Sequence, residues 1–539
     1  MLIKKIFILF LIISSLSFSQ KKTEQPKLIV GIVIDQMRYD YLIKFNRYFG
    51  QGGFNKLLNN GSNFTFAHFN YVPTFTAPGH SSIYTGTTPF YHGIIANDWF
   101  DRIKKHMVNS VSDDSFQSVG VQTGEGERSP NKLLASTITD QLKIATNGKA
   151  KVISISIKDR ASILPGGHSA DEAFWYSNKS GNFITSTYYM KKLPEWVQDF
   201  NQKKLPDSFV SQEWNLSLPD SDYLISSPDE VNYEADVFNE GRVSFPHSFK
   251  NVNSESKYSA LAKTPFGNQL ILEFVKAAIL NENLGKNSVP DFLAVSFSST
   301  DYIGHEYGPN SVEIEDTYIK LDKQIEDLIS FLDKQVGNGN YLLFLTADHG
   351  VMESPGYLKK LKINGENFDT KSFYDSLKSF AIANYNDAKI IQNYSNQQIF
   401  LNYEIINFKK LNLIKVEKNF AEYLRNNIPQ ISLVLTKSEL QKETAARTSN
   451  DLIINGFNFK RSGDIIFEFE PNIIPDHKKG STHGSIYNYD THIPIIFYGW
   501  HIPPQKINTP VYIVDIAPTI ADLIGITEPN ACMGIPLIK

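Results

Sequence analysis

The stretch Lys27–Asp35, KLIVGIVID, is a run of apolar and small residues that ends on an aspartate. An unbroken run of this kind, rich in β-branched residues, predicts a strand at 28–34 that is buried on both faces of a sheet. Stretches with helical periodicity, such as 268–281 and 311–335, separate several further runs. The alternation predicts an α/β fold with a mostly parallel central sheet flanked by helices. The further runs are at residues 151–157, 292–297, 341–346 and 493–498.

Polar side chains able to bind ions follow four of these predicted strands. They are Asp35, Lys158, Asp301 and Asp348. Ligands of open α/β sheets bind outside the carboxyl ends of the strands, so we expect these side chains to lie close together. Three histidines accompany them: His305, His349 and His483. Carboxylates and imidazoles without thiolates favour a catalytic metal site over a structural one, and zinc accepts both ligand types.

A candidate nucleophile lies between the first two of these segments, in PTFTAPGHSSIYTG at residues 73–86. Thr76 precedes Pro78 by two residues, which predicts that Thr76 is the N-cap of a helix. A threonine in that position usually does no more than cap. Beside six metal ligands its hydroxyl gains a second role, because a helix N-terminus and a bound metal ion both favour the alkoxide.

Composition sets limits on the class of protein. The chain has 539 residues, 41% of them hydrophobic, and a formal charge of −4, so it can bury a large core. Because no long basic run is present, a nucleic-acid partner is not expected. Cys532 is the only cysteine, so no intramolecular disulfide can form.

The first nineteen residues have the pattern of an export signal. Lys4 and Lys5 precede an apolar stretch at 6–13, and Ser17 and Ser19 fit the small-residue rule for cleavage before Gln20. The apolar stretch is too short to span a bilayer comfortably. We therefore expect a protein that is exported to the periplasm or secreted, without a stable membrane anchor.

The rest of the chain divides into a core and two regions that depart from the alternation of strands and helices. The predicted catalytic core covers 20–355, with an irregular insertion at about 166–264 that could act as a lid. Residues 356–472 have their own pattern of helices and alternating strands, which predicts a small inserted α+β cap. Residues 473–539 return to the core and end with a helix predicted in DIAPTIADLIGI at 515–526. Among the other histidines, we expect His80 to support the ligands, His92 to be solvated and His492 to support the metal shell.

The motifs together resemble the alkaline phosphatase superfamily, and most closely its secreted PafA-type alkaline phosphatases, which use a threonine nucleophile and two zinc ions. The resemblance rests on PTFTAPGH, AND, SIKDR, DYIGHEYGP, TADHG, GSTHG and DIAPTIADLIGI, with KRSGD at 460–464 near the end of the cap. It covers essentially the whole mature chain. Each motif is weak by itself, and the set is highly specific.

The resemblance implies a role for each candidate residue. One zinc ion would be held by Asp301, His305 and His483. The other would be held by Asp35, Asp348 and His349, with Thr76 completing its ligands. Asn97, Lys158 and Arg160 would bind the phosphoryl oxygens. The implied reaction is hydrolysis of phosphate monoesters through a covalent phosphothreonine.

Lys158 and Arg160 bear on the choice of substrate. Two zinc ions, three aspartates and an alkoxide leave a site close to neutral, so these two cations make it positive. A monoester carries more negative charge than a diester and is therefore favoured. The alternatives are a phosphodiesterase or phosphonate hydrolase of the same superfamily, or a secreted protein that binds phosphate without turnover. The natural ester, the oligomeric state and the identity of the metal beyond this resemblance stay open.

Overall fold

The computed structural model describes residues 24–447, 452–476 and 479–538. The predicted export signal, 1–19, lies outside them. Five parallel strands form the centre of the main sheet, and the N-terminal run Leu28–Ile34 (β1) is in the middle. The five strands, in order across the sheet, are β12 (Tyr341–Thr346), β1, β11 (Asp291–Phe297), β6 (Val152–Ser156) and β7 (Glu172–Tyr176).

Antiparallel strands extend this sheet on both sides. On one side β12 pairs with β19 (His492–Gly499), which pairs with β2 (Ser62–His68). On the other side β7 pairs with β8 (Phe183–Ser186), which pairs with β5 (Ser118–Val119). Two short strands, β20 (Gln505–Ile507) and β21 (Val511–Tyr512), pair in parallel with β2 and bring the sheet to eleven strands within the described residues.

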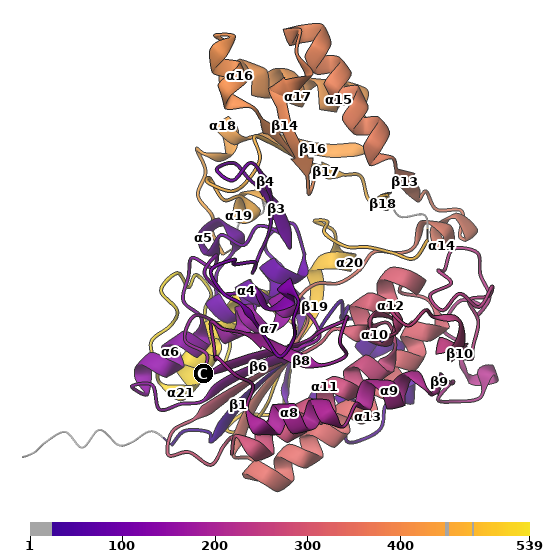
Figure 1. Ribbon diagram of the computed structural model, residues 1–539, viewed down its shortest axis with the longest axis vertical. Helices are drawn as coiled ribbons and strands as arrows, with labels where there is room; N and C mark the ends of the chain where they lie inside the picture. Colours follow the sequence, from indigo (N-terminus) through magenta and orange to yellow (C-terminus); the bar gives the residue numbers. More distant parts are fainter. Residues whose placement is uncertain (1–23, 448–451, 477–478, 539) are drawn as a thin grey trace, which may run out of the picture.

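Helices cover both faces of the sheet (Figure 1). One layer contains α4 (Thr76–Thr85), α6 (Ile138–Ala145), α7 (Asp159–Gly166) and α21 (Ile516–Ile524), which contact one another. The other contains α11 (Pro265–Asn281), α12 (Ser299–Tyr307) and α13 (Val312–Leu332). All residues of β1, β11 and β12 are buried, which explains their continuous apolar sequences. This architecture confirms the predicted fold class.

Regular structure extends further into the predicted irregular insertion than its composition indicates. Its first part supplies β7 and β8, which belong to the main sheet rather than to a separate lid. After them come short helices, turns and a two-stranded pair formed by β9 (Glu213–Trp214) and β10 (His247–Ser248). The apolar side chains of β7 and β8 pack into the core. Both strands are too short for the hydrophobic periodicity of the sequence to distinguish them from a loop.

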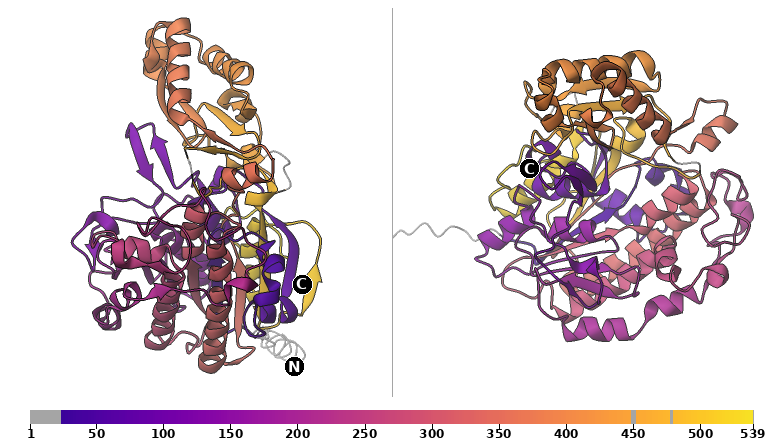
Figure 2. Two further views of the ribbon diagram at one scale, coloured as in Figure 1. Left: turned by 90° about the vertical axis from the view of Figure 1, so that its right-hand side faces the viewer. Right: turned by 45° about the horizontal axis from the view of Figure 1, so that its top comes forward.

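The region predicted to be an inserted cap, residues 356–472, lies on one side of the main body and is called the cap below (Figures 1 and 2). Its described part has an antiparallel sheet of four strands covered by helices, with a hydrophobic core separate from that of the main body. The strands, in order, are β14 (Ile391–Ser395), β15 (Gln398–Leu401), β17 (Ile465–Phe469) and β16 (Ile431–Thr436). The larger helices are α15 (Thr370–Tyr385) and α17 (Leu413–Asn427).

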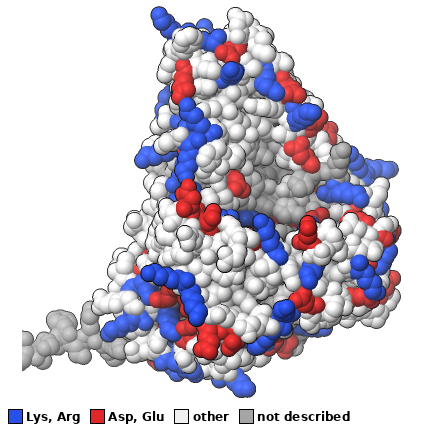
Figure 3. All heavy atoms as spheres, viewed as in Figure 1, with Lys and Arg blue, Asp and Glu red and all other residues white. Residues whose placement is uncertain are grey.

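A hairpin of the core meets the cap. It consists of β3 (Asp98–Asp101) and β4 (His106–Asn109). Arg102, in its turn, lies 2.6 Å from the carboxylate of Asp464, and Phe100 packs edge-on against Phe400 of β15. Figure 3 shows the surface hollowed between the cap and the main body, with acidic and basic side chains interspersed over this face. Among the described residues, no helix is both long and apolar enough to cross a membrane.

Candidate metal centre and active site

Three buried aspartates meet where β1, β11 and β12 end. These strands are neighbours in parallel register, with Ile34 opposite Phe297 and Val33 opposite Thr346. Asp35 follows β1 directly, Asp348 follows β12 by two residues, and Asp301 lies in the first turn of α12. The carboxyl ends of parallel strands share one edge, so the three carboxylates converge as expected from the sequence.

Three imidazoles face the same place, and each is oriented by a backbone carbonyl. Nδ1 of His305 lies 2.9 Å from the carbonyl of Ser481. Nδ1 of His349 lies 2.9 Å from the carbonyl of Gly350, and Nδ1 of His483 lies 2.7 Å from that of Thr74. A carbonyl can only accept, so Nδ1 must carry the proton, and Nε2 of each neutral ring is left as an acceptor. This is the arrangement that metal-binding histidines use.

The ligand atoms form two overlapping groups. Asp301, His349 and His483 form one, and Asp35, Asp348 and His349 form the other; within each group the ligand atoms all lie within 4.8 Å of one another. The Nε2 of His305 lies 3.1 Å from Oδ1 of Asp301, so this ring adjoins the first group. The structure thus brings together all six residues that were predicted as ligands. His349 is within reach of both groups, whereas the resemblance places it in one.

The donor set fits divalent cations. Oδ1 of Asp35 and Oδ2 of Asp348 are buried and lack a hydrogen-bond partner among the described residues. Unpaired carboxylate oxygens in a protein interior are costly unless a cation neutralises them. Two such atoms beside neutral imidazole acceptors are the chemistry that a zinc ion satisfies.

The pKa shifts of the candidate ligands also favour a bound cation. Burial, reinforced by the charge of Asp35, raises the pKa of Asp348 well above its ordinary value. Burial also raises the pKa of Asp35 to about 6. Burial lowers the pKa of His483 to about 3, so this imidazole is neutral at neutral pH and free to bind a metal ion.

Thr76 lies next to the ligands. Its Oγ1 is 3.5 Å from Nε2 of His349 and 3.4 Å from Nζ of Lys158. The prediction that Thr76 is the N-cap was wrong by one residue: α4 begins at Thr76, and the N-cap is Phe75, whose backbone is extended. The hydroxyl therefore makes no capping bond and faces the ligands. A Cβ on Gly79 would lie 2.2 Å from the carbonyl oxygen of Asp348, so glycine lets α4 approach the end of β12.

Of the three candidate phosphoryl-binding residues, Lys158 contacts the aspartates directly. Nζ of Lys158 is 2.7 Å from Oδ2 of Asp35 and 2.5 Å from Oδ2 of Asp301. Burial would lower the pKa of Lys158, but these two carboxylates outweigh it and raise the pKa above its ordinary value. Oδ1 of Asn97 accepts a hydrogen bond from the backbone N–H of Ala77, 2.8 Å away. Arg160 lies in the first turn of α7, and its Nε is buried without a hydrogen-bond partner among the described residues.

Two positioning residues were missed by the sequence analysis. Nε2 of Gln36 donates to Oδ1 of Asp301 at 2.8 Å, and its backbone N–H donates to Asp348 at 3.1 Å. Asp490 accepts bonds from the backbone N–H groups of Gly484 and Ser485, at 3.0 and 2.7 Å, and so fixes the loop that carries His483. Gln36 directly follows a ligand, which could have suggested a role. Nothing in the sequence around Asp490 indicates one.

Three further histidines had been given roles. Nδ1 of His80 hydrogen-bonds the carbonyl of Thr76 at 2.9 Å and lies 3.4 Å from Asp348, so it supports the site. The expectation for His92 was wrong: it is fully buried and hydrogen-bonds Ser82 at 3.0 Å. The expectation for His492 was also wrong, because its Nε2 bonds the carbonyl of Thr65 and its ring stacks on His68, within the main sheet.

Comparisons with known proteins agree with this geometry. Residues 29–492 match the family described as type I phosphodiesterase / nucleotide pyrophosphatase. A Myroides odoratus protein named calcium-transporting ATPase is 43% identical over 525 residues, 96% of this chain and 95% of its own. Alkaline phosphatase PafA of Elizabethkingia meningoseptica is 40% identical over 544 residues, 99% of this chain and 98% of its own.

A crystal structure of wild-type PafA superposes with a TM-score of 0.92 at 40% identity, covering 96% of this chain and 99% of PafA. The agreement extends over the main sheet and the cap alike. This chain therefore belongs to the alkaline phosphatase superfamily, among its PafA-type members.

Proposed function

We propose that this protein is an exported, zinc-dependent alkaline phosphatase that hydrolyses phosphate monoesters through a phosphothreonine at Thr76. The observation that carries the proposal is the hydroxyl of Thr76, uncommitted to capping and within 3.5 Å of both His349 and Lys158. The relatives carry different names, and the geometry of the site favours the phosphatase.

Asp301, His305 and His483 would hold one zinc ion, and Asp35, Asp348 and His349 the other. Bound there, the ions would supply positive charge that favours the alkoxide of Thr76 and neutralises the departing ester oxygen. Thr76 Oγ attacks phosphorus, the Oγ–P bond forms and the ester P–O bond breaks, releasing the alcohol. Water then attacks the phosphothreonine, the Oγ–P bond breaks and inorganic phosphate leaves.

Three other residues would hold the phosphoryl group during both steps. Asn97 is fixed by its bond to Ala77, which leaves its Nδ2 hydrogens to donate to a phosphoryl oxygen. Lys158 and Arg160 supply two positive charges, and charge-assisted bonds to phosphate are among the stronger ones in proteins. Since a monoester has one more negative charge than a diester, these cations select the monoester.

Two further parts of the proposal concern export and domain organisation. Export is inferred from the charged and apolar residues of 1–19. The division into a core with an inserted cap at 356–472 is supported by the separate hydrophobic core of that region.

A phosphodiesterase is the second candidate, because the matching family is described by that activity. The test compares 4-nitrophenyl phosphate with methyl 4-nitrophenyl phosphate on the zinc-loaded protein, with Lys158→Ala, Arg160→Ala and the control Lys151→Ala. Lys151 precedes the other end of β6 and pairs with Glu282 there. The wild type should prefer the monoester. Each active-site variant should lose roughly 10- to 100-fold in kcat/KM on the monoester, the value of one or two charged hydrogen bonds, and much less on the diester.

Zinc content is measured for every variant, and Arg160→Ala is decisive because Arg160 does not contact the aspartates that would bind zinc. A wild type that prefers the diester, or variants that leave the monoester-to-diester ratio unchanged, would overturn the proposal. The Lys151→Ala control should match the wild type.

A further inference from the structure

The tip of the hairpin formed by β14 and β15 lies against the candidate active site. Its two turn residues, Asn396 and Gln397, have φ values of 52° and 54°, the left-handed pair that makes a tight two-residue turn. Nδ2 of Asn396 donates to the backbone carbonyl of Asp98, 2.7 Å away. Asp98 directly follows Asn97, a candidate phosphoryl-binding residue. One hydrogen bond therefore joins the cap to the edge of the active site.

A cavity of about 270 Å³ lies beneath this tip. Phe75, Thr482 and His483 line its core side, and Tyr394, Asn396 and Gln397 line its cap side. Phe75 precedes Thr76 and packs edge-on against His483, with ring centroids 5.6 Å apart. The cavity thus adjoins both the candidate nucleophile and the group of ligands that contains His483. We call it the hairpin cavity.

The hairpin cavity has unused hydrogen-bonding groups. Two more of its lining residues, Thr370 and Ser395, have buried hydroxyls that lack a partner among the described residues. Buried polar groups in proteins are nearly always paired, so unpaired ones beside a cavity indicate a ligand or water that pairs with them. The side-chain amides of Asn396 and Gln397 add donors and acceptors, and Tyr394 and Phe75 add aromatic surface.

Resting on the function proposed above, we propose that the hairpin cavity receives the leaving group of the substrate and selects a neutral, hydroxyl-bearing ring. In an in-line displacement the alcohol departs on the side of phosphorus opposite Thr76. Thr76 would join the ligand group of Asp35, Asp348 and His349. The departing oxygen would therefore lie toward the other group, and one member of that group, His483, lines this cavity. A leaving group that departs on that side enters the space beneath the hairpin.

The size and chemistry of the cavity define the leaving group. Ligand sites are typically about 300–1,000 Å³, so a cavity slightly below that range suits a sugar or nucleoside rather than a larger molecule. Asp476 is the one carboxylate among the described lining residues, and no lysine or arginine is among them. An anionic leaving group would therefore find no countercharge among these described residues. The aromatic surface of Tyr394 and the adjoining amides suit a ring that carries hydroxyls.

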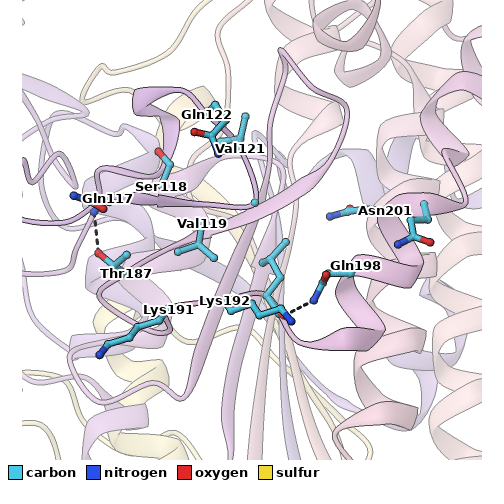
Figure 4. A pocket seen from close by; sticks show the side chains of 13 residues that line it. Gln117, Ser118, Val119, Val121, Gln122, Thr187, Lys191, Lys192, Gln198 and Asn201 are labelled. Atoms are coloured by element: carbon cyan, nitrogen blue, oxygen red, sulfur yellow. Dashed lines mark hydrogen bonds between the residues drawn. The ribbon is translucent and has the colours of Figure 1, made fainter.

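A larger cavity, about 540 Å³, is a weaker candidate (Figure 4). It lies at β5 and β8, which β11, β6 and β7 separate from β1. None of its lining residues has a buried side-chain N or O atom without a hydrogen-bond partner among the described residues. Two of its amides bond within the protein: Gln198 donates to the carbonyl of Leu193 at 2.8 Å, and Asn201 exchanges two bonds with the backbone of Phe183. Polar groups that are satisfied within the protein give no indication of a ligand.

The test uses monoesters of primary alcohols: uridine 5′-monophosphate, glucose 6-phosphate and methyl phosphate. The variants are Tyr394→Ala and Gln397→Gly; glycine retains the left-handed turn while removing the amide. Tyr423→Ala is the control, because Tyr423 stacks on Phe380 at 4.4 Å in the cap and does not line the cavity. The wild type should favour at least one ring substrate over methyl phosphate. Each cavity variant should reduce that preference by about 10-fold or more, the usual cost of lost specificity contacts.

Binding is measured separately from turnover, with uridine and glucose titrated into the zinc-loaded wild type and variants by saturation-transfer NMR. The alcohol that binds the wild type and not the Tyr394→Ala variant identifies which kind of ring the cavity takes. If the protein hydrolyses monoesters but favours neither ring substrate, or if the cavity variants and the control give the same ratios, the inference about the hairpin cavity is overturned and the proposed function stands. If no monoester is hydrolysed, the proposed function itself is overturned, and this inference with it.

Discussion

Gln36 donates a hydrogen bond from Nε2 to Oδ1 of Asp301 over 2.8 Å, and so joins the segments that follow β1 and β11. The residue adopts φ 64°, which is uncommon for a residue other than glycine. A Cβ on Gly304 would lie 1.8 Å from Oε1 of Gln36, so glycine at 304 makes room for this amide. The geometry indicates that Gln36 holds Asp301 in position for its role as a ligand.

Replacing Gln36 with glycine should therefore weaken zinc binding. Glycine accepts the left-handed backbone and keeps the N–H bond to Asp348, so the change removes the side chain with its amide and leaves the backbone conformation in place. Loss of a partner that orients a ligand typically costs about 10- to 100-fold in metal affinity. Competition with a chromogenic chelator measures it. Asn147→Gly, the same backbone change at an exposed residue with φ 50°, is the control. Equal zinc affinities in the two variants would show that Gln36 does not orient Asp301.

Thr76→Ala should abolish turnover and the covalent intermediate while phosphate still binds. Removing the nucleophile of a covalent hydrolase costs on the order of 10⁴-fold or more in kcat. Thr76→Ser keeps a hydroxyl and should retain measurable activity. Mass spectrometry after an acid quench should find phosphate on residue 76 in the wild type and the serine variant. Thr85→Ala, at the other end of α4, is the matched control, since the Thr85 hydroxyl bonds only within that helix. Phosphate trapped on another residue would refute the assignment.

Lys158 stands between two carboxylates that would also bind metal, so its removal should affect the metal-free protein most. Deleting one partner of a buried ion pair typically costs about 3–5 kcal/mol, because the charge left behind is uncompensated. Bound zinc would supply the missing positive charge. Lys158→Ala should therefore lower Tm by more in the metal-free protein than in the zinc-loaded one. Lys151→Ala should lower both equally. A Tm loss of the same size with and without zinc would contradict this account of Lys158.

The sequence was sufficient to predict the centre of the fold and the convergence of the candidate ligands, and the reason is physical. Runs buried on both faces are recognisable without their partners, and β1 and β12 have the predicted bounds. The carboxyl ends of such strands must meet, so the convergence of Asp35, Asp301 and Asp348 follows from topology. The roles of Thr76, Lys158 and Arg160 stay predictions that the experiments above test, and the role of Asn97 stays a prediction.

Features that depend on distant segments could not be predicted. His92 follows a proline in a polar turn, which is typical of a solvated residue. It is buried because Asn458 and Arg461, far along the chain, donate to the carbonyls of Phe90 and Gly93 and cover that turn. The φ of Gln36 and the contact of Asn396 with Asp98 likewise arise from tertiary packing, which periodicity does not report.

The last prediction concerns pH and the end of α7, the helix whose first turn contains Arg160. His168 follows this helix, and its Nδ1 lies 3.1 Å from Oδ2 of Asp140. The hydrogen bond to Asp140 raises the pKa of His168 above its ordinary 6.5. Burial opposes a low pKa for Asp140, but its bonds to His168 and Thr137 outweigh it and lower the pKa below 3.8.

These two pKa shifts determine how the stability contributed by each group changes with pH. A histidine whose pKa is higher in the folded state stabilises the fold fully below pH 6.5, and the contribution is lost as pH rises through the folded value. The contribution of Asp140 is lost only as pH falls below 3.8. The pair therefore stabilises the fold most between about pH 4 and 6.5. Because the His168 side chain is 35% exposed, solvent screening limits its value to roughly 0.5–1 kcal/mol. His168→Gln should lower Tm more at pH 5.5 than at pH 8.5, whereas His106→Gln, at an exposed position of β4, should show no such difference. A larger loss at pH 8.5 would mean that the neutral ring, through its bond to the carbonyl of Leu133, and not the ion pair, holds the end of α7.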